Sequence, residues 1–402
     1  MRALTAVLLA LVAGCPGGGS APDAGPIDAG LDAAWPGSAT FTVDVAPFTI
    51  HPAGVGEHVA FPDVLRLPDG HLLLAYRVAA SHNVDVTGRI VGQVGEQDGV
   101  TWSDPTTLLD VAGVDDRDPS LTLLPSGEIG LSYFQYVLQS TTDGTMAVHQ
   151  VFLARSPADV IAFGDPALVP PGGAMDYPGA HLASALWVDA DGAPVIVQAC
   201  SSPIARAGAR LLLPAYGGQS WNSANAASPR SRLTLFASDD GGATWSAQPV
   251  APEAATDVWL QEPSLLVLDD NRFLVHLRTA TGDSPGNAGP LEQTRTGDGG
   301  ATWEAYTAFP FIGHAPYLYR LSSGVILSAF RELNADMSQA NVSFIYSLDE
   351  GGTWSDPIRI LPWVAADLGY PSIRELDDGR VLIVFYTGGT AISAVIYDVT
   401  VT

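Results

Sequence analysis

One stretch of this chain, from Gln261 to Trp303, decides its fold. Two apolar runs, Leu265-Leu266-Val267-Leu268 and Phe273-Leu274-Val275-His276-Leu277, flank the turn Asp269-Asp270-Asn271-Arg272. This pattern predicts a buried β-hairpin. The segment then ends in Thr296-Gly297-Asp298-Gly299-Gly300-Ala301-Thr302-Trp303, which predicts a tight turn closed by an aromatic anchor.

The same unit recurs along the chain, and each copy opens with a proline. Intervals of 53 to 60 residues separate most copies and 84 residues separate the second from the third, the opening residues being Pro62, Pro119, Pro203, Pro263, Pro316 and Pro371. A period of this length suits one four-stranded blade per copy. The sequence therefore predicts an all-β, six-bladed β-propeller, closed by pairing of residues 40–50 with residues 392–401. Seven blades remain an alternative, because residues 183–199 have the pattern of a further hairpin.

Composition excludes one large class of partner. The chain has 402 residues, 47% of them hydrophobic, and a net charge of −25. Such a charge argues against phosphate neutralisation and so against nucleic-acid binding. All 18 basic residues are arginines, whose planar fork suits carboxylates wherever one is placed in a site.

The N-terminus has the pattern of a targeting segment. Arg2 precedes an apolar run over residues 4–12 that is too short to span a bilayer. The run leads into Leu11-Val12-Ala13-Gly14-Cys15, which resembles a bacterial lipoprotein signal box. The resemblance implies cleavage before Cys15 and lipidation of its sulfur; an ordinary secretory signal is the alternative.

These boundaries divide the chain into a signal (1–15), a flexible tether rich in Gly, Ala, Pro and Asp (16–39) and a propeller domain (40–402). We expect a secreted monomer, lipid-anchored at the bacterial outer membrane or cell surface or in the periplasm, which contacts the membrane only through its anchor. Cys200 lies in an apolar run and is predicted to be a buried small hydrophobe without a disulfide partner.

In a propeller hairpin, the start of the first strand and the end of the second lie on one face, which we call the mouth. The residues expected there precede each opening proline or follow it by fifteen positions: Phe61, Asp118, Glu262, Ala315 and Tyr370, then Arg77, Phe134, Arg278, Arg331 and Tyr386. Polar loops are expected beside them at Ser81–Asp85 and Asp115–Arg117. Arginines gathered at one mouth of an acidic protein favour an acidic ligand.

Three glycine-rich boxes close hairpins of the repeat, and a degraded fourth spans 95–102. The complete boxes are Ser238–Trp245, Thr296–Trp303 and Ser347–Trp354. They resemble the Asp-boxes of the sialidase (neuraminidase) superfamily, and the resemblance covers roughly residues 57–402. Because the boxes lie away from the site in that family, a structural role is expected for Asp240, Asp298 and Asp349.

The resemblance also implies site residues. Tyr370 resembles the family's tyrosine nucleophile, and Glu262, followed by Arg278, resembles its partner carboxylate and one of its three substrate-binding arginines. Asp85 falls in the loop expected for the acid/base, with Asp118 as the alternative. These residues imply an exo-acting glycoside hydrolase that retains configuration and acts on sialic acid or a related acidic sugar.

The chain departs from the family pattern at two arginines. Ala60-Phe61-Pro62 stands where the family has Arg-Ile-Pro, and Ser338-Gln339-Ala340-Asn341 stands where it has a third arginine. We interpret Arg77 and Arg331 as replacements, with Arg117 and His82 as further substrate-binding residues. Two alternatives stay open: a non-catalytic propeller that binds a glycan or a protein, and a hydrolase or lyase acting on a uronate-type sugar.

The histidines near the mouth show no ligand spacing that names a metal, so His58, His82, His181 and His314 are expected to line the site as polar groups. No cofactor is expected, although calcium in an Asp-rich turn stays open. The expected partner is an acidic carbohydrate or glycoconjugate.

Overall fold

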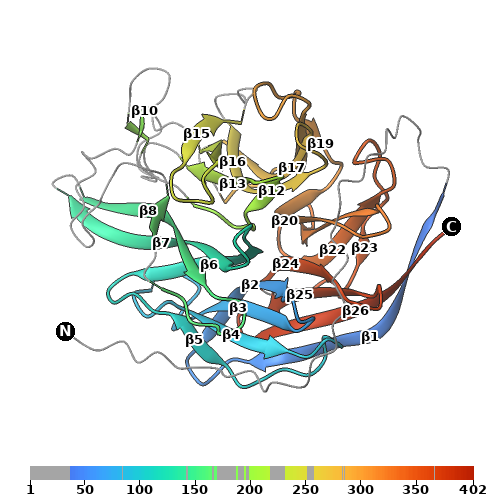
Figure 1. The fold of residues 1–402 in the computed structure, drawn as a ribbon, viewed down its shortest axis with the longest axis horizontal. Helices are drawn as coiled ribbons and strands as arrows, with labels where there is room; N and C mark the ends of the chain where they lie inside the picture. The colour runs from blue at the N-terminus through green and yellow to red at the C-terminus, as the bar shows by residue number, and fades with distance from the viewer. Residues whose placement is uncertain are drawn as a thin grey trace.

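The computed structural model describes residues 37–402, apart from 84, 142–143, 165–166, 170–186, 189–193, 196–198, 218–230, 251–257, 283, 285 and 366. Every regular element in this part is a β-strand. Six four-stranded sheets form a ring (Figure 1), which confirms the predicted six-bladed propeller. Nothing among the described residues has the helical length and apolar character needed to span a bilayer. The predicted signal, lipidation site and most of the tether lie outside the described residues.

The first three blades each follow chain order from inner to outer strand. Blade 1 contains β2 (His58–Arg66), β3 (Leu72–Ala79), β4 (Arg89–Gly95) and β5 (Thr106–Leu109). Blade 2 contains β6 (Asp115–Leu123), β7 (Ile129–Thr141), β8 (Gly144–Ser156) and β9 (Ala167–Val169). Blade 3 contains β12 (Ala205–Ala207), β13 (Arg210–Gly217), β14 (Arg232–Ser238) and β15 (Ser246–Pro249).

The next two blades follow the same order. Blade 4 contains β16 (Val258–Val267), β17 (Phe273–Thr281), β18 (Leu291–Thr296) and β19 (Thr307–Ala308). Blade 5 contains β20 (Ile312–Arg320), β21 (Ile326–Leu333), β22 (Ala340–Ser347) and β23 (Ile358–Arg359).

Blade 6 joins the two ends of the propeller. It contains β24 (Leu368–Glu375), β25 (Val381–Thr387), β26 (Ala391–Val401) and, as its outer strand, β1 (Ala39–Pro52). β1 pairs antiparallel with β26 from Ala39 opposite Val401 to Pro52 opposite Ala391, side by side in Figure 1. This pairing confirms the predicted closure, in which the first strand completes the last blade.

The seven-blade alternative is wrong. The hairpin expected within 183–199 exists as β10 (Trp187–Val188) and β11 (Pro194–Val195), but these strands form a separate two-stranded sheet. Two residues per strand bury too little surface to make a blade. The long interval between the second and third prolines therefore contains an insertion between blades 2 and 3.

The second strand of blade 1 is its most deeply buried element. Every residue of β3 is buried, including Leu72, Leu73 and Leu74. Such a strand has ladder partners on both edges and apolar neighbours on both faces, which explains why its sequence is apolar except for Arg77. Cys200 is buried and free, as predicted.

The residue before the opening proline has the same unusual backbone in five blades. The φ angles lie between 47° and 58°, a left-handed region that residues with a Cβ seldom adopt, at Phe61, Asp118, Glu262, Ala315 and Tyr370. In each blade this residue and the proline together oppose a single residue of the second strand, which makes a β-bulge. Left-handed backbone costs about 1–2 kcal/mol per residue, so its repetition marks this ring of residues as a candidate functional surface.

The Asp-boxes stabilise turns between third and fourth strands, at the end of the blades opposite the mouth. In blade 4, Asp298 accepts hydrogen bonds from the Thr302 amide (2.8 Å), the Thr302 hydroxyl (2.6 Å) and the Thr296 hydroxyl (2.8 Å). Asp240 and Asp349 make the equivalent bonds. The hydrogen bonds lower the pKa of Asp240 and of Asp298 to about 2, so both carboxylates stay ionised and hold their turns.

We expect Asp349→Ala to lower the free energy of unfolding by about 1–2 kcal/mol, because the Thr353 amide and two hydroxyls lose their acceptor. Thermal unfolding followed by circular dichroism measures the change. Asp239→Ala is the matched control, since that carboxylate is 81% exposed and lies 3.5 Å from Arg210 as its nearest cation. Equal melting temperatures for the two variants would contradict a structural role for the box.

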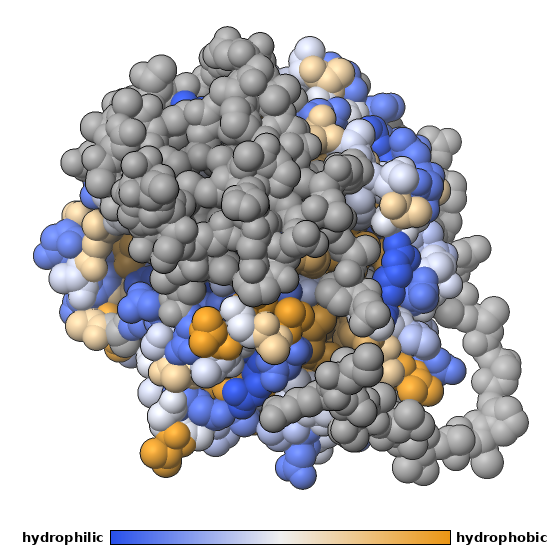
Figure 2. All heavy atoms as spheres, turned by 90° about the vertical axis from the view of Figure 1, so that its left-hand side faces the viewer, coloured by the Kyte–Doolittle hydropathy of each residue, from blue (hydrophilic) through white to orange (hydrophobic). Residues whose placement is uncertain are grey.

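Figure 2 shows one side of the molecule, where hydrophilic residues are interspersed with small groups of hydrophobic ones. The large hydrophobic side chains exposed in the described part of the chain are Val43, Val55, Val86, Val100 and Met337, which lie far apart in sequence. Single exposed apolar residues are ordinary on a protein surface and define no interface.

Candidate functional site

The mouth is built as the repeat predicted. The residues fifteen positions after the prolines pair with the residues just before the bulges: Ala60 with Arg77, Arg117 with Phe134, Gln261 with Arg278, His314 with Arg331 and Gly369 with Tyr386. Both sets of residues therefore lie at the same end of their blades.

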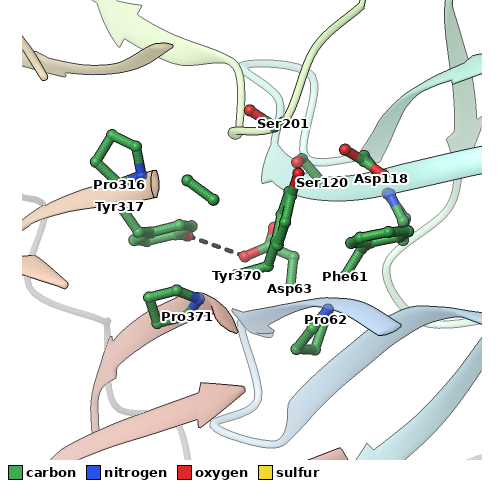
Figure 3. Close-up of a pocket in the computed structure, with 12 residues that line it drawn as sticks. Phe61, Pro62, Asp63, Asp118, Ser120, Ser201, Pro316, Tyr317, Tyr370 and Pro371 are labelled. Carbon is green, nitrogen blue, oxygen red and sulfur yellow. Dashed lines mark hydrogen bonds between the residues drawn. The ribbon is translucent and has the colours of Figure 1, made fainter. Parts of the chain in front are cut away.

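A small pocket opens between the inner strands of blades 1, 2, 5 and 6 (Figure 3). Four of the five left-handed residues line it, namely Phe61, Asp118, Ala315 and Tyr370. The bulges thus bring an aromatic ring, a carboxyl group and a phenol from three blades to one small space.

Below these residues, a buried carboxylate joins four blades. Asp63 accepts hydrogen bonds from the Leu121 amide (2.6 Å), the Tyr317 hydroxyl (3.0 Å, dashed in Figure 3) and the Ser372 hydroxyl (2.5 Å). Burial raises the pKa of Asp63. Because each of its partners belongs to another blade, Asp63 fixes the positions of the inner strands that form the pocket.

Tyr370 and Glu262 form the central contact of the mouth. The Tyr370 hydroxyl donates to Glu262 Oε1 over 2.6 Å, and Arg278 Nη1 donates to the same oxygen over 2.8 Å. Glu262 Oε2 accepts from the Ala315 amide at 2.8 Å. Glu262 is only 3% exposed, so these donors hold its carboxylate in one orientation.

The phenol of Tyr370 is neutral in this arrangement. Burial, followed by the negative charge of Glu262, raises its pKa well above the usual value. A nucleophilic phenolate therefore requires transfer of the proton to a base during the reaction, and Glu262 is the carboxylate in contact with that proton.

Asp118 is buried beside this pair. It is 5% exposed, lines the pocket, and its Oδ1 has no hydrogen-bond partner among the described residues. Burial raises the pKa of Asp118 to about 7. A carboxyl group with this pKa is half protonated near neutral pH, as a general acid requires.

Asp85 is placed differently. Its Oδ1 accepts from the Thr87 hydroxyl (2.7 Å) and the Thr87 amide (3.0 Å), which lie in its own loop. These bonds, with the hydroxyl contributing most, lower the pKa of Asp85. The carboxylate is ionised and engaged in its own turn, so its geometry favours a structural role over proton donation.

The structure does not present Arg77 to a ligand. Its guanidinium pairs with Asp115 through Nε–Oδ1 (2.7 Å) and Nη2–Oδ2 (2.9 Å), and both side chains are fully buried. The backbone oxygens of Ser81 and Asn83 accept its remaining bonds. Arg77 therefore anchors the loop after β3 instead of facing the mouth.

The expected polar loop at 115–117 is wrong, because these residues begin strand β6 and are buried. Arg117 Nη1 donates to Asp115 Oδ2 and to the His82 carbonyl oxygen, both over 3.2 Å. Its guanidinium also lies over the Phe61 ring, 5.1 Å from the centroid. Arg117 is 8% exposed and borders the pocket through Phe61.

The other two expected ligand-binding residues meet at a carboxylate that sequence reasoning missed. Asp367 lies 2.8 Å from His82 Nδ1 and 3.3 Å from His58 Nε2, both measured to Oδ2. Its Oδ1 accepts from the Tyr386 hydroxyl at 2.7 Å and lies 3.6 Å from Arg331 Nη1. Asp367 is three residues before Tyr370, a proximity that is the only sequence signal for it.

The two departures from the family pattern remain departures in space. Ala60, at the position of the family's first arginine, is fully buried, and the next residue, Phe61, packs against Tyr370 with ring centroids 4.7 Å apart. Gln339, at the position of the family's third arginine, is exposed, and its backbone amide donates to Asn334 Oδ1 at 3.0 Å. His314 is also buried, with a lowered pKa caused by burial, while His181 lies outside the described residues.

The structure is thus a six-bladed propeller with a hydrogen-bonded tyrosine–glutamate pair at its mouth. Residues 193–383 match the model of the BNR repeat-like domain. The match covers a little under half of the chain and agrees with the fold and the Asp-boxes.

Solved structures share the fold at low identity. A protein of unknown function from Dyadobacter fermentans is 21% identical, with a TM-score of 0.71 over 90% of this chain and 99% of its own. NanB sialidase from Streptococcus pneumoniae is 13% identical (TM-score 0.60, 88% and 70%). The intramolecular trans-sialidase from Ruminococcus gnavus is 12% identical (TM-score 0.61, 87% and 96%). No curated protein matches the chain.

Proposed function

We propose that this protein is a sialidase-like exo-glycoside hydrolase that acts with retention of configuration on sialic acid or a related acidic sugar. One observation carries the proposal: the 2.6 Å hydrogen bond from the Tyr370 hydroxyl to a Glu262 carboxylate that is fixed by Arg278 and a backbone amide. Tyr370 attacks the anomeric carbon while its proton passes to Glu262.

As the glycosidic C–O bond breaks, Asp118 protonates the leaving oxygen, and it later takes a proton from the water that displaces Tyr370, whose oxygen regains its proton from Glu262. This assignment of Asp118 rests on its place in the pocket, its unpartnered oxygen and its pKa of about 7. Asp85 is the second choice, because its carboxylate is engaged by Thr87 and its pKa is lowered.

Arg278 and Arg331 are the arginines that we propose for binding the acidic group, with Arg117 and His82 at the rim. Arg278 and Arg331 are 16% and 24% exposed at their side chains, whereas Arg77 is fully buried. A guanidinium shielded from bulk water binds a carboxylate with about 1.5–3 kcal/mol per contact. We further propose a monomer that is secreted and anchored through a lipidated Cys15.

The test is release of a fluorophore from a fluorogenic sialoside by the purified protein and by Glu262→Gln. We expect the parent to release the fluorophore and Glu262→Gln to release it about 10²–10⁴-fold more slowly, because the amide cannot accept the Tyr370 proton. The matched control is Glu304→Gln, at the far end of blade 4, which should keep the parent rate. Equal rates in the parent and Glu262→Gln would contradict the proposal.

A second candidate is a propeller that binds an acidic glycan without turning it over. The observation in its favour is that the buried Ala60 stands in place of the family's first arginine and that Arg77 is buried against Asp115. A glycan array separates the two functions. Binding without turnover would favour the binding function if Arg278→Ala abolishes it and the surface variant Arg206→Ala keeps it. Turnover of uronate glycosides alone would instead change the proposed substrate class.

A further inference from the structure

Three side chains with metal-binding atoms meet at the rim between blades 1 and 6. His58 begins β2, His82 lies in the loop after β3, and Asp367 directly precedes β24. One ligand atom from each lies within 4.8 Å of the others. The nearest approaches are to Asp367 Oδ2, at 2.8 Å from His82 Nδ1 and 3.3 Å from His58 Nε2.

One of these two separations matches the edge of a coordination tetrahedron, and the other is close to it. Zinc bonds of about 2.0–2.2 Å to nitrogen and oxygen place neighbouring ligand atoms about 3.3–3.5 Å apart. The His58–Asp367 distance already has this value, and the His82–Asp367 distance needs to widen by about half an ångström. The side chains of His82 and Asp367 are 46% and 34% exposed, so solvent reaches the site and the shift meets little packing.

The surroundings hold two of the three groups in place. The Tyr386 hydroxyl binds Asp367 Oδ1 at 2.7 Å, which leaves Oδ2 directed at the imidazoles. His58 packs against Gly389 so closely that a Cβ on that glycine would lie 2.2 Å from the ring. Outer groups of this kind orient metal ligands and tune their affinity.

We propose that His58, His82 and Asp367 bind a divalent transition-metal ion, with Zn²⁺ as the best match. Two imidazoles and one carboxylate suit zinc, and three protein ligands leave a fourth position for water or a ligand. Calcium and magnesium prefer larger sets of oxygen ligands, which this cluster lacks. The competing explanation is a hydrogen-bonded cluster in which Asp367 pairs with one or both imidazoles and no metal enters.

The ion would add positive charge at this part of the mouth, where Arg331 Nη1 already lies 3.6 Å from Asp367 Oδ1. With neutral imidazoles the three side chains carry one negative charge, and a bound divalent ion converts this to one positive charge. His82 contacts Phe61, and Phe61 contacts Tyr370, with ring centroids 5.7 and 4.7 Å apart. The cation would therefore lie near the position where the expected first arginine is missing. This consequence for an acidic ligand rests on the proposed function, whereas the metal site itself does not.

The test is calorimetric titration of ZnCl₂ into the full chain after treatment with a chelator, in the absence of sugar. We expect the parent to bind zinc at one site. His82→Ala and Asp367→Asn should each lower the zinc affinity about a hundredfold or more. Tyr386→Phe, which changes only the positioning of Asp367, should lower it about tenfold. Replacement of zinc by Co²⁺ should give the intense visible absorption of four-coordinate cobalt, which a structural effect of the variants does not produce.

His71→Ala is the matched control. His71 contacts two carboxylates, Asp69 at 3.1 Å and Glu96 at 3.5 Å, at the opposite end of blade 1. It should leave the titration unchanged, and CaCl₂ should not compete. The proposal is overturned if the parent binds no zinc, if both ligand variants bind as the parent does, or if His71→Ala alone removes binding. Because no sugar is present, loss of the hydrolase proposal leaves this result unaffected.

Discussion

Replacement of Tyr370 by Phe should lower kcat on a cleavable acidic glycoside by about 10³-fold or more while the protein stays folded. The variant lacks the hydroxyl that attacks the anomeric carbon, and removal of a nucleophile costs at least this much in comparable enzymes. Folding should survive because the ring keeps its contact with Phe61, although the variant loses the hydrogen bond to Glu262. Steady-state kinetics and the melting temperature measure the two effects.

Tyr346→Phe is the matched control for this prediction. Tyr346 lies in β22 and packs against Phe41 of β1, 5.2 Å between centroids and remote from the mouth. It should keep the parent kcat. Full activity in Tyr370→Phe would exclude the tyrosine mechanism, and a comparable loss in both variants would indicate a folding effect.

The second large effect is expected for Asp118→Asn. This substitution should lower kcat/KM by about 10²–10⁴-fold and change its pH profile. A general acid must be protonated, and the pKa of Asp118 is raised to about 7 by burial. In the parent, kcat/KM should therefore be high below pH 7 and fall about tenfold per unit above it. In Asp118→Asn this alkaline fall should be absent from the residual activity.

Asp116→Asn is the matched control, because it removes a neighbouring buried carboxyl group whose pKa is raised to a similar value. Burial raises the pKa of Asp116 to about 7 as well, but its carboxylate accepts from the Val111 amide and from Gln135, away from the pocket. The alkaline fall should persist in this variant. If Asp118→Asn keeps the parent profile and Asp85→Asn loses the fall, the acid is Asp85.

The fold could be predicted because its determinants are local and repeated. Each opening proline, apolar run and glycine turn lies within one hairpin, and the repeat places Glu262, Arg278 and Tyr370 at the mouth without further information. The left-handed bulge before the prolines escaped prediction, because a residue before proline ordinarily prefers extended backbone. The pairing of the finished sheets accommodates the left-handed residue as a β-bulge opposite one residue of the second strand.

The site was harder to predict where a charged side chain forms an ion pair with a residue that is distant in the sequence. Arg77 occupies the expected position, yet Asp115, which is 38 positions away, pairs with it in the interior. The cluster of His58, His82 and Asp367 joins three segments that the ring closure brings together, so no spacing along the chain reveals it. Periodicity predicts which residues share a face, whereas their charge partners depend on tertiary contacts.

The most direct test is to trap the covalent intermediate on Tyr370. A difluorinated sialic acid is suitable, because its fluoride leaving group permits the first step while the second fluorine slows release through an oxocarbenium-like transition state. Trypsin cleaves after Arg359 and Arg374, so a peptide of residues 360–374 carries Tyr370 as its only tyrosine. We predict that mass spectrometry finds the sugar on this peptide and that Tyr370→Phe remains unlabelled. An unmodified peptide, or a label on any other residue, would contradict the tyrosine mechanism.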